Sequence, residues 1–213
     1  MKKILFQGDS ITDCGRNRED IANLGGGYPK FVGARLGYEF PSAYSFVNKG
    51  ISGNRIVDVY ARIKADIINL KPDYMSILIG VNDVWHEVAI SNGVDINKYE
   101  KIYTMLLEEI LEALPNIKIM ILEPFVVKGT ATEDNADIPD RYSRFCKVKE
   151  YAKVARRIAD KFGFSFVELQ DRFDAACASN QNNAYWVRDG VHPTDFGHEL
   201  IARAWLEEFE KIK

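Results

Sequence analysis

The chain has 213 residues, of which 46% are hydrophobic and 28% are charged, ordinary values for a globular protein that can bury a substantial core. Its formal net charge of -3 argues against a nucleic-acid-binding protein, which would normally present a basic face. No stretch approaches the about 20 apolar residues needed to cross a bilayer, and the apolar run Ile4–Phe6 is too short for a signal peptide. We therefore expect one domain over residues 1–213, located in the cytoplasm, without nucleic-acid or membrane partners.

The three cysteines, Cys14, Cys146 and Cys177, are odd in number and widely separated, and no Cys-x-x-Cys pair occurs. This pattern indicates free thiols rather than a disulfide framework or a zinc site. The chain also contains no His-Glu-x-x-His or comparable spacing of metal ligands. We therefore expect neither a metal nor another cofactor.

In chain order, short apolar segments alternate with longer helical patterns, which is typical of a parallel sheet covered by helices on both faces. The predicted strands are Lys3–Gln7, Ser45–Asn48, Tyr74–Ile79, Lys118–Leu122 and Ser165–Leu169. They are rich in Ile, Val, Phe and Leu without a clean polar–apolar alternation, as expected for strands buried on both faces. The pattern predicts an α/β fold.

Apolar stripes with a period of about 3.6 residues predict helices over Tyr99–Ala113, Tyr151–Phe162 and Phe196–Phe209. Pro115 marks the end of the first of these helices. The polar segment Gly129–Asp140 follows a predicted strand, which would place it at the carboxyl edge of the sheet. Because ligands bind at that edge in open α/β sheets, we interpret this segment as a lid or rim.

The tripeptide Gly8-Asp9-Ser10 directly follows the first predicted strand and places Ser10 at the carboxyl end of that strand. A serine hydroxyl becomes nucleophilic at neutral pH only when a neighbouring base accepts its proton. By itself, the tripeptide could equally be a polar turn. It is also not the Gly-x-Ser-x-Gly elbow of the α/β-hydrolases, so that family is not supported.

Near the other end of the chain, Asp189 and His192 lie three positions apart. On one turn, the carboxylate can hold the imidazole, fix its tautomer and stabilise the imidazolium that forms when Ser10 loses its proton. The alternative is a plain surface turn before the last helix. We interpret the other two histidines, His86 and His198, as structural.

Two further segments carry groups that ester hydrolysis requires. Asn48–Gly53 follows the second predicted strand, and Gly80–Asp83 follows the third. A glycine backbone N–H, as at Gly53, and an asparagine amide, as at Asn82, can donate hydrogen bonds to the negative oxygen of a tetrahedral intermediate. Because all these groups follow successive elements, we expect them to meet at one edge of the sheet.

Together these blocks resemble the SGNH/GDSL hydrolases. Ser10, Gly53, Asn82 and His192 fill the four positions that give that family its name, in the family's order, and the resemblance extends from residue 8 to residue 193. It implies a three-layer α/β/α sandwich with a flavodoxin-like parallel sheet of five strands. It further implies a catalytic triad of Ser10, Asp189 and His192. The implied oxyanion hole consists of the Ser10 and Gly53 N–H groups and the Asn82 side chain.

By the same resemblance, Ser10 attacks the ester carbonyl and His192 protonates the departing alcohol, after which water activated by His192 releases the acyl group. Three longer strings, Gly8–Arg16, Val47–Asn54 and Ile79–Trp85, resemble the intracellular acetylxylan esterases of bacteria. That branch implies a serine esterase that removes small acyl groups, above all acetyl, from xylo-oligosaccharides or related sugars. The resemblance agrees with a cytoplasmic location and leaves a homo-oligomer open.

Pyranose rings pack on aromatic side chains, so aromatic residues near the motif blocks are candidates for sugar contacts, with core or rim packing as the competing role. The candidates are Tyr28, Trp85, Tyr185 and Trp186. For substrate contact we select Asp9, Trp85 and Tyr185. Arg55 and Arg188 flank two motif blocks and could bind sugar hydroxyls or an anionic group, but we expect both to be solvated surface charges.

Two alternatives remain open. A lipid esterase, thioesterase or lysophospholipase would use the same chemistry with an apolar channel for a long acyl chain, and the sequence does not resolve the depth of the pocket. A non-catalytic flavodoxin-like module would bind a nucleotide or phosphate. The one glycine run, Gly25–Gly27, lacks the context of a phosphate-binding loop, and this alternative leaves Asp189 and His192 unexplained.

Overall fold

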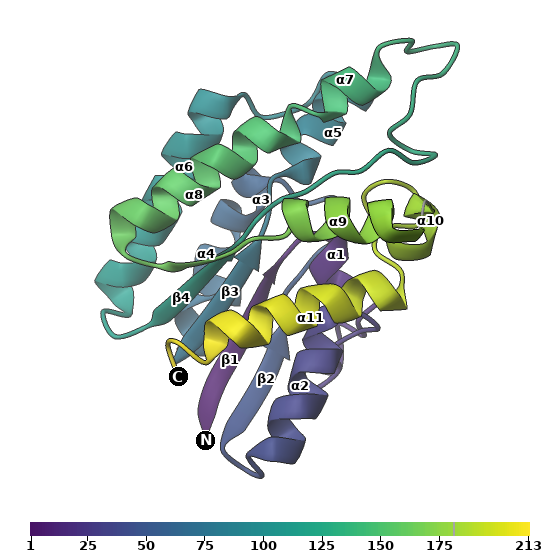
Figure 1. Ribbon diagram of the computed structural model, residues 1–213. Helices are drawn as coiled ribbons and strands as arrows, with labels where there is room; N and C mark the ends of the chain where they lie inside the picture. Colours follow the sequence, from purple (N-terminus) through teal and green to yellow (C-terminus); the bar gives the residue numbers. More distant parts are fainter. Residues whose placement is uncertain (181) are drawn as a thin grey trace.

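The computed structural model describes residues 1–180 and 182–213. Its five strands form one parallel sheet in the order β2-β1-β3-β4-β5 (Figure 1). The strands are β1 (Lys2–Gly8), β2 (Tyr44–Asn48), β3 (Tyr74–Leu78), β4 (Lys118–Leu122) and β5 (Ser165–Val167). The predicted α/β fold with a flavodoxin-like sheet is therefore confirmed.

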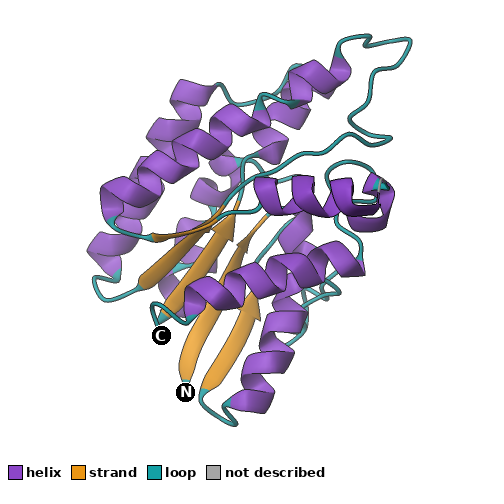
Figure 2. Cartoon of the chain, in the orientation of Figure 1, coloured by secondary structure: helices purple, strands orange, loops and turns teal. Residues whose placement is uncertain are grey.

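Helices cover both faces of this sheet. The helices before β4 are α1 (Ser10–Asp13), α2 (Tyr28–Glu39), α3 (Ile56–Ala61), α4 (Ile63–Asp66), the 3-10 helix η1 (Ile68–Leu70), α5 (Val81–Ile90) and α6 (Ile96–Ala113). Those after β4 are α7 (Arg141–Phe145), α8 (Val148–Phe162), α9 (Gln170–Asn180), α10 (Asn183–Trp186) and α11 (Asp195–Phe209). Helices α2 and α11 pack together on one face, and α3, α6 and α8 pack on the other (Figure 2).

The five predicted strands coincide with observed ones, and no end differs by more than two residues. The largest difference is at β5, which ends at Val167 instead of Leu169. There the Glu123 carboxylate accepts hydrogen bonds from the backbone N–H groups of Leu169 and Gln170, at 2.7 and 2.8 Å. These donors point to a side chain instead of a neighbouring strand, so the ladder stops.

The three predicted helices lie within α6, α8 and α11, and local capping explains several of their ends. The Asp95 side chain accepts a hydrogen bond from the Lys98 N–H at 3.0 Å and begins α6. Thr194 caps α11 in the same way, and Gly163 ends α8 in the left-handed conformation. The placement of Phe196 on a core-facing stripe was wrong. Phe196 is 50% exposed in the first turn of α11, where its ring stacks on Tyr185 instead of facing the sheet.

The strand order places one crevice at the carboxyl edge of the sheet. In this order the chain leaves β1 toward β2 but leaves β3 toward β4, so the connections after the neighbouring strands β1 and β3 run in opposite directions. In open α/β sheets, ligands bind at such a switch point. The segments that follow β1, β2 and β3 begin at Asp9, Lys49 and Ile79, which are the blocks singled out in the sequence.

The buried apolar side chains form one core cluster that extends from Ile4 to Phe209. Trp205 of α11 is fully buried in it, with its ring centroid 5.6 Å from that of Phe6 on β1 and 4.8 Å from that of Phe209. These contacts fix α11 against the central strand. They therefore also fix the start of α11, which follows the Asp189–His192 turn.

We expect Trp205→Ala to lower the free energy of unfolding by about 3–5 kcal/mol, because the substitution leaves a large cavity between α11 and β1. Urea unfolding followed by circular dichroism measures the change. Phe196→Ala is the matched control, and its effect should stay within about 0.5 kcal/mol because that ring is exposed. Equal losses from the two variants would contradict this description of the core.

Candidate active site

Ser10 lies on a short turn between β1 and α1, and the side chain of Asp9 fixes the conformation of this turn. Strand β1 ends at Gly8 and α1 begins at Ser10, with Asp9 as its N-cap accepting a hydrogen bond from the Ile11 N–H at 3.0 Å. Asp9 is only 1% exposed, and burial raises its pKa to about 7 although the Ile11 bond opposes the rise. A side chain in this position cannot face a substrate, which corrects the expectation for Asp9.

The turn that carries His192 is built as a tight antiparallel contact. Val187 lies opposite Pro193, and the Arg188 N–H donates to the His192 carbonyl at 2.8 Å. Pro193 needs no donor at its own position in this pair. Gly190 has a φ of +103°, and a Cβ there would lie 2.4 Å from the Thr132 hydroxyl, so the turn requires glycine.

Asp189, His192 and Ser10 form a continuous chain of hydrogen bonds. His192 Nε2 lies 2.9 Å from Ser10 Oγ, and His192 Nδ1 lies 2.7 Å from Asp189 Oδ2. Burial would raise the pKa of Asp189, but hydrogen bonds from the His192 ring and from the His192 and Val191 N–H groups lower it to about 2. The hydrogen bond to Asp189 raises the pKa of His192, against the opposing effect of burial. An ionised Asp189 keeps the proton on Nδ1, so Nε2 can accept the proton of Ser10.

Residues 127–132, which include the start of the segment Gly129–Asp140 predicted to be a lid or rim, support this turn. The Val127 N–H donates to the Gly190 carbonyl and the Ala131 N–H to the Asp189 carbonyl, both at 2.9 Å. The buried Thr132 hydroxyl bonds to the Val127 carbonyl at 2.8 Å. The exposed remainder of the loop projects from the body between β4 and α7 (Figure 1). Thr132 carried no recognisable signal in the sequence.

Gly53 and Asn82 reach the same edge from the segments after β2 and β3. Asn82 is 6% exposed, and its Nδ2 donates to the Asn54 carbonyl at 3.1 Å. The Arg62 guanidinium in turn holds the Asn54 side chain at 2.7 Å. The Ser10 and Gly53 N–H groups donate to no acceptor within the described part of the chain, so both are free to bind a ligand oxygen.

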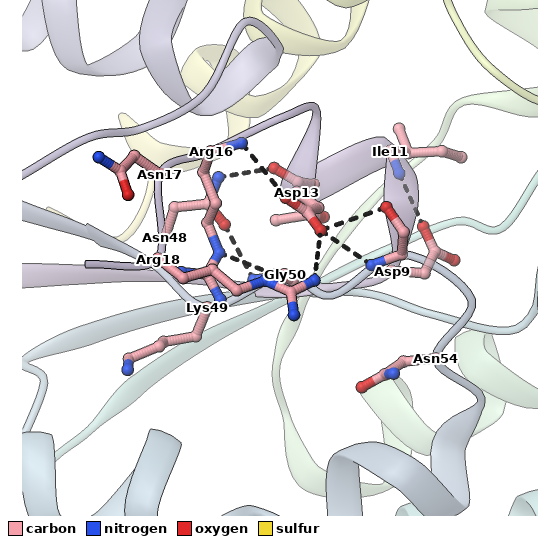
Figure 3. Close-up of polar contacts among 12 residues, drawn as sticks. Asp9, Ile11, Asp13, Arg16, Asn17, Arg18, Asn48, Lys49, Gly50 and Asn54 are labelled. Carbon is pink, nitrogen blue, oxygen red and sulfur yellow. Dashed lines mark hydrogen bonds and ion pairs between the residues drawn. The ribbon is translucent and has the colours of Figure 1, made fainter. Parts of the chain in front are cut away.

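A buried carboxylate that sequence reasoning missed joins the Gly53 loop to α1. Asp13 is 5% exposed and accepts hydrogen bonds from the Ser52 N–H at 2.9 Å and the Ser52 hydroxyl at 3.2 Å. The Arg18 guanidinium lies 3.3 Å from the same carboxylate oxygen (Figure 3). Ser52 directly precedes Gly53, so Asp13 sets the position of the Gly53 N–H relative to Ser10.

Asn48 and Gly50 bring the two segments into direct contact. The Asn48 amide donates to the Thr12 carbonyl at 2.6 Å and accepts from the Gly50 N–H at 2.9 Å (Figure 3). A Cβ on Gly50 would lie 2.4 Å from the Asp13 nitrogen, closer than any side chain can approach. The glycine therefore permits the close packing of the β2 loop on α1.

The aromatic candidates differ in their positions. The half-buried Trp85 ring lies 5.7 Å from the His192 ring and 5.5 Å from Phe145. Tyr185 is 41% exposed and stacks on Phe196 with ring centroids 4.4 Å apart. Tyr28 is fully buried in the core, which removes it as a sugar contact, and Trp186 is half-buried. Among the aromatic side chains of the described residues, Trp85 alone makes a ring contact with His192.

The two arginines also differ from each other. Arg55 was expected to be a solvated charge, but its side chain is only 17% exposed and bonds to Asp58 at 3.0 Å and to the Asn92 carbonyl at 2.7 Å. Arg188 is exposed, as expected.

His198 has a structural position. It is 3% exposed, and its Nδ1 accepts a hydrogen bond from the Tyr28 N–H at 3.2 Å, while Nε2 lies 3.4 Å from Cys14 Sγ. Burial lowers its pKa to about 4, which keeps the ring neutral. Cys14, Cys146 and Cys177 are all free thiols, as predicted.

Within residues 1–180 and 182–213, no group of three or more His, Cys, Asp and Glu side chains is arranged to hold a metal ion. In the same residues, no helix has both the length and the apolar character required to cross a bilayer.

Comparison with known proteins assigns the family. Residues 6–200 match the GDSL-like lipase/acylhydrolase family. This chain belongs to that family. The resemblance drawn from the sequence motifs is thereby confirmed, and the protein is a carboxylic ester hydrolase that acts on small-molecule esters.

Two relatives are similar over nearly the whole chain. The acetylxylan esterase of Geobacillus stearothermophilus is 36% identical over 225 aligned residues, which cover 100% of this chain and 96% of the relative. Its crystal structure matches with a TM-score of 0.83 at 35% identity, covering 97% of this chain and 93% of that one. A GDSL-like lipase from Parabacteroides merdae gives a TM-score of 0.87 at 37% identity, with coverages of 98% and 95%.

Solved variants of the Geobacillus stearothermophilus esterase include catalytic mutants in which a serine, an aspartate or a histidine is replaced by alanine. In that enzyme the aspartate precedes the histidine by three positions. A tryptophan, replaced by isoleucine in another variant, stands immediately before the aspartate.

We expect Asp13→Ala to loosen the Gly53 loop, because the substitution removes the acceptor of both Ser52 bonds. Amide hydrogen exchange at Ser52, whose N–H donates to Asp13, should become at least about tenfold faster, the effect of losing a contribution of about 1.4 kcal/mol from hydrogen bonds to a charged group. Asp137→Ala, at an exposed site, is the matched control and should leave the exchange rate of Ser52 unchanged. Unchanged exchange in Asp13→Ala would show that other contacts hold the loop.

Proposed function

We propose that the protein is a serine esterase that uses Ser10, His192 and Asp189 as its catalytic triad and removes acetyl groups from acetylated xylo-oligosaccharides or related sugars. The observation that carries the proposal is the continuous hydrogen-bond chain from Ser10 Oγ through His192 to Asp189, with distances of 2.9 and 2.7 Å. We further propose that residues 1–213 act as one hydrolase domain, since a single core cluster spans them.

In the proposed mechanism, His192 Nε2 takes the proton of Ser10 as Oγ attacks the ester carbonyl. The negative oxygen of the tetrahedral intermediate is bound by the N–H groups of Ser10 and Gly53 and by the Asn82 amide. His192 then gives its proton to the departing alcohol. A water molecule activated by His192 attacks the acyl group on Ser10, and the intermediate collapses to free acid and enzyme.

The relative supports the choice of residues. Its catalytic mutants replace one serine, one aspartate and one histidine, and the aspartate and histidine are separated as Asp189 and His192 are. The imidazolium formed during the reaction lies beside an ionised Asp189, which lowers the energy of the charged state.

The name of that relative also supports an acetyl ester of xylan as the substrate. Trp85 lies against His192, where a pyranose ring of the alcohol part could pack on the indole. We propose Trp85 as a substrate contact on this basis. Tyr185 is accessible but already stacked on Phe196, and its role as a sugar contact stays a prediction.

A series of p-nitrophenyl esters from acetate to octanoate tests the substrate class, alongside acetate release from acetylated xylobiose. We expect kcat/KM to be highest for the acetate. Activity that rises toward octanoate would instead support the lipid esterase alternative.

Ser10→Ala should lower kcat at least about 10³-fold, because the nucleophile is lost. Ser143→Ala, an exposed serine on α7, is the matched control and should keep the wild-type rate. His192→Ala should be as damaging as Ser10→Ala, whereas His198→Ala should retain turnover close to wild type. Loss of activity in His198→Ala equal to that in His192→Ala, in a folded protein, would refute the assignment of the base.

The pH profile provides a second test of the triad. His192 must be neutral to accept the serine proton, and its pKa lies above the ordinary value of 6.5 because Asp189 stabilises the charged form. We therefore expect kcat/KM to rise with pH through an ionisation centred above 6.5. In Asp189→Asn the residual activity should be low, and its midpoint should move to lower pH. An unchanged midpoint would contradict coupling between the two groups.

A further inference from the structure

The side chain of Arg188 shares one face of its turn with His192. Val187 and Pro193 are directly opposite each other and both are buried. The next pair along this contact is Arg188 and His192, joined by the 2.8 Å backbone hydrogen bond. Residues directly opposite in an antiparallel pair project from the same face, and neighbours along the chain project from opposite faces. Because Val187 and Pro193 point inward, Arg188 and His192 both point outward.

The guanidinium of Arg188 is exposed and makes no hydrogen bond or ion pair with any side chain of residues 1–180 and 182–213. Arg16, Arg55 and Arg62, near the other motif blocks, are all bound to carbonyls or carboxylates of the protein. The positive charge of Arg188 opposes the rise in the pKa of His192, which agrees with its position beside that ring. The guanidinium of Arg188 is thus an unpaired cation beside His192.

Arg188 lies on the side of the site that receives the alcohol part of the ester. The oxyanion donors come from Ser10, Gly53 and Asn82, whereas His192 delivers its proton to the leaving alcohol. A group beside the exposed side of His192 therefore faces the alcohol part of the ester and not the acyl part.

The related esterase differs at this point. Its tryptophan immediately before the catalytic aspartate corresponds to Arg188 when the two Asp-x-x-His segments are matched. An indole offers an apolar surface to the C–H face of a sugar, whereas a guanidinium offers a planar set of donors that matches a carboxylate. Replacing the tryptophan by Arg188 therefore changes an apolar surface beside the leaving group into a positively charged one.

We propose that Arg188 is a specificity-determining residue that binds a carboxylate on the alcohol part of the substrate, so that this esterase favours acetylated acidic sugars over neutral ones. The proposal rests on the proposed function and names a narrower substrate class for the same site.

Paired substrates isolate this contact. 4-Acetoxybenzoate and its methyl ester carry the same acetyl group and differ in one negative charge on the leaving group. The acetylated methyl glycosides of glucuronic acid and xylose form the corresponding pair of sugars. Intrinsic reactivity cancels when each pair is compared between wild type and variant.

Arg188→Gln should lower kcat/KM for the anionic member of each pair about fivefold, mainly through KM, and leave the neutral member within about twofold. Arg188→Lys should retain part of the preference, and added salt should weaken the preference of the wild type. Arg157→Gln is the matched control: it removes the same charge from α8, which packs on the other face of the sheet from α11, and should change neither substrate.

Equal loss on both members of a pair, or no loss on either, would overturn the proposal. A lost preference in Arg157→Gln as well would also overturn it, because it would show an effect of net charge rather than contact at Arg188. A ratio of kcat/KM for the anionic and neutral acetates that is the same in wild type and in Arg188→Gln, with both enzymes active, would refute the role of Arg188 and leave the esterase function standing. Failure to cleave any acetyl ester, with Ser10→Ala indistinguishable from wild type, would instead refute the proposed function.

Discussion

The arrangement of the site depends on one hydrogen bond, from Ser10 to His192, between residues 182 positions apart in the chain. Ser10 is delivered by β1, a central strand of the sheet, and His192 by a turn that precedes the last helix. Neither side chain has a catalytic property by itself. A serine hydroxyl is too weak an acid to ionise at neutral pH, and an imidazole in water has no fixed tautomer. The fold supplies both missing conditions by bringing the two groups to one edge.

The surrounding structure holds this pair still. Asp189 binds the imidazole with one oxygen and the backbone of the same turn with the other. The loop after β4 supports that turn from behind through two backbone bonds and the packing of Thr132 on Gly190, while Asp13 ties the Gly53 loop to the helix of Ser10. Buried polar groups with satisfied partners are rigid, so the donors need little reorganisation when charge develops on the substrate. The region around Ser10 and His192 is therefore densely hydrogen-bonded.

The two residues beside the exposed side of His192, Trp85 and Arg188, make fewer contacts that hold the site together. Trp85 and Arg188 both lie beside His192, one through a ring contact and the other through the antiparallel turn. Within the described residues, neither is hydrogen-bonded to Ser10, so either can change without disturbing the bonds among Ser10, His192 and Asp189. Under the proposed function, this separation allows the same family chemistry to serve different alcohols, because the carbonyl oxygen meets the proposed oxyanion donors while the leaving alcohol meets Trp85 and Arg188.

Much of the fold and the centre of the site could be predicted from the sequence. Strand and helix positions follow from periodicity, which is a local property, and Ser10, Gly53, Asn82 and His192 could be grouped because parallel strands end at a common edge. Asp9, Phe196 and Arg55 were misjudged because burial and pairing depend on which distant segments pack against a residue. The roles of Asp13 and Thr132 were missed for the same reason. Asp13 bonds to Ser52, which is 39 positions away in the chain, and Thr132 packs against Gly190 of a distant turn. The sequence thus determined the elements and the reactive groups, whereas the tertiary structure alone decided which polar groups are buried and which charge remains free beside the site.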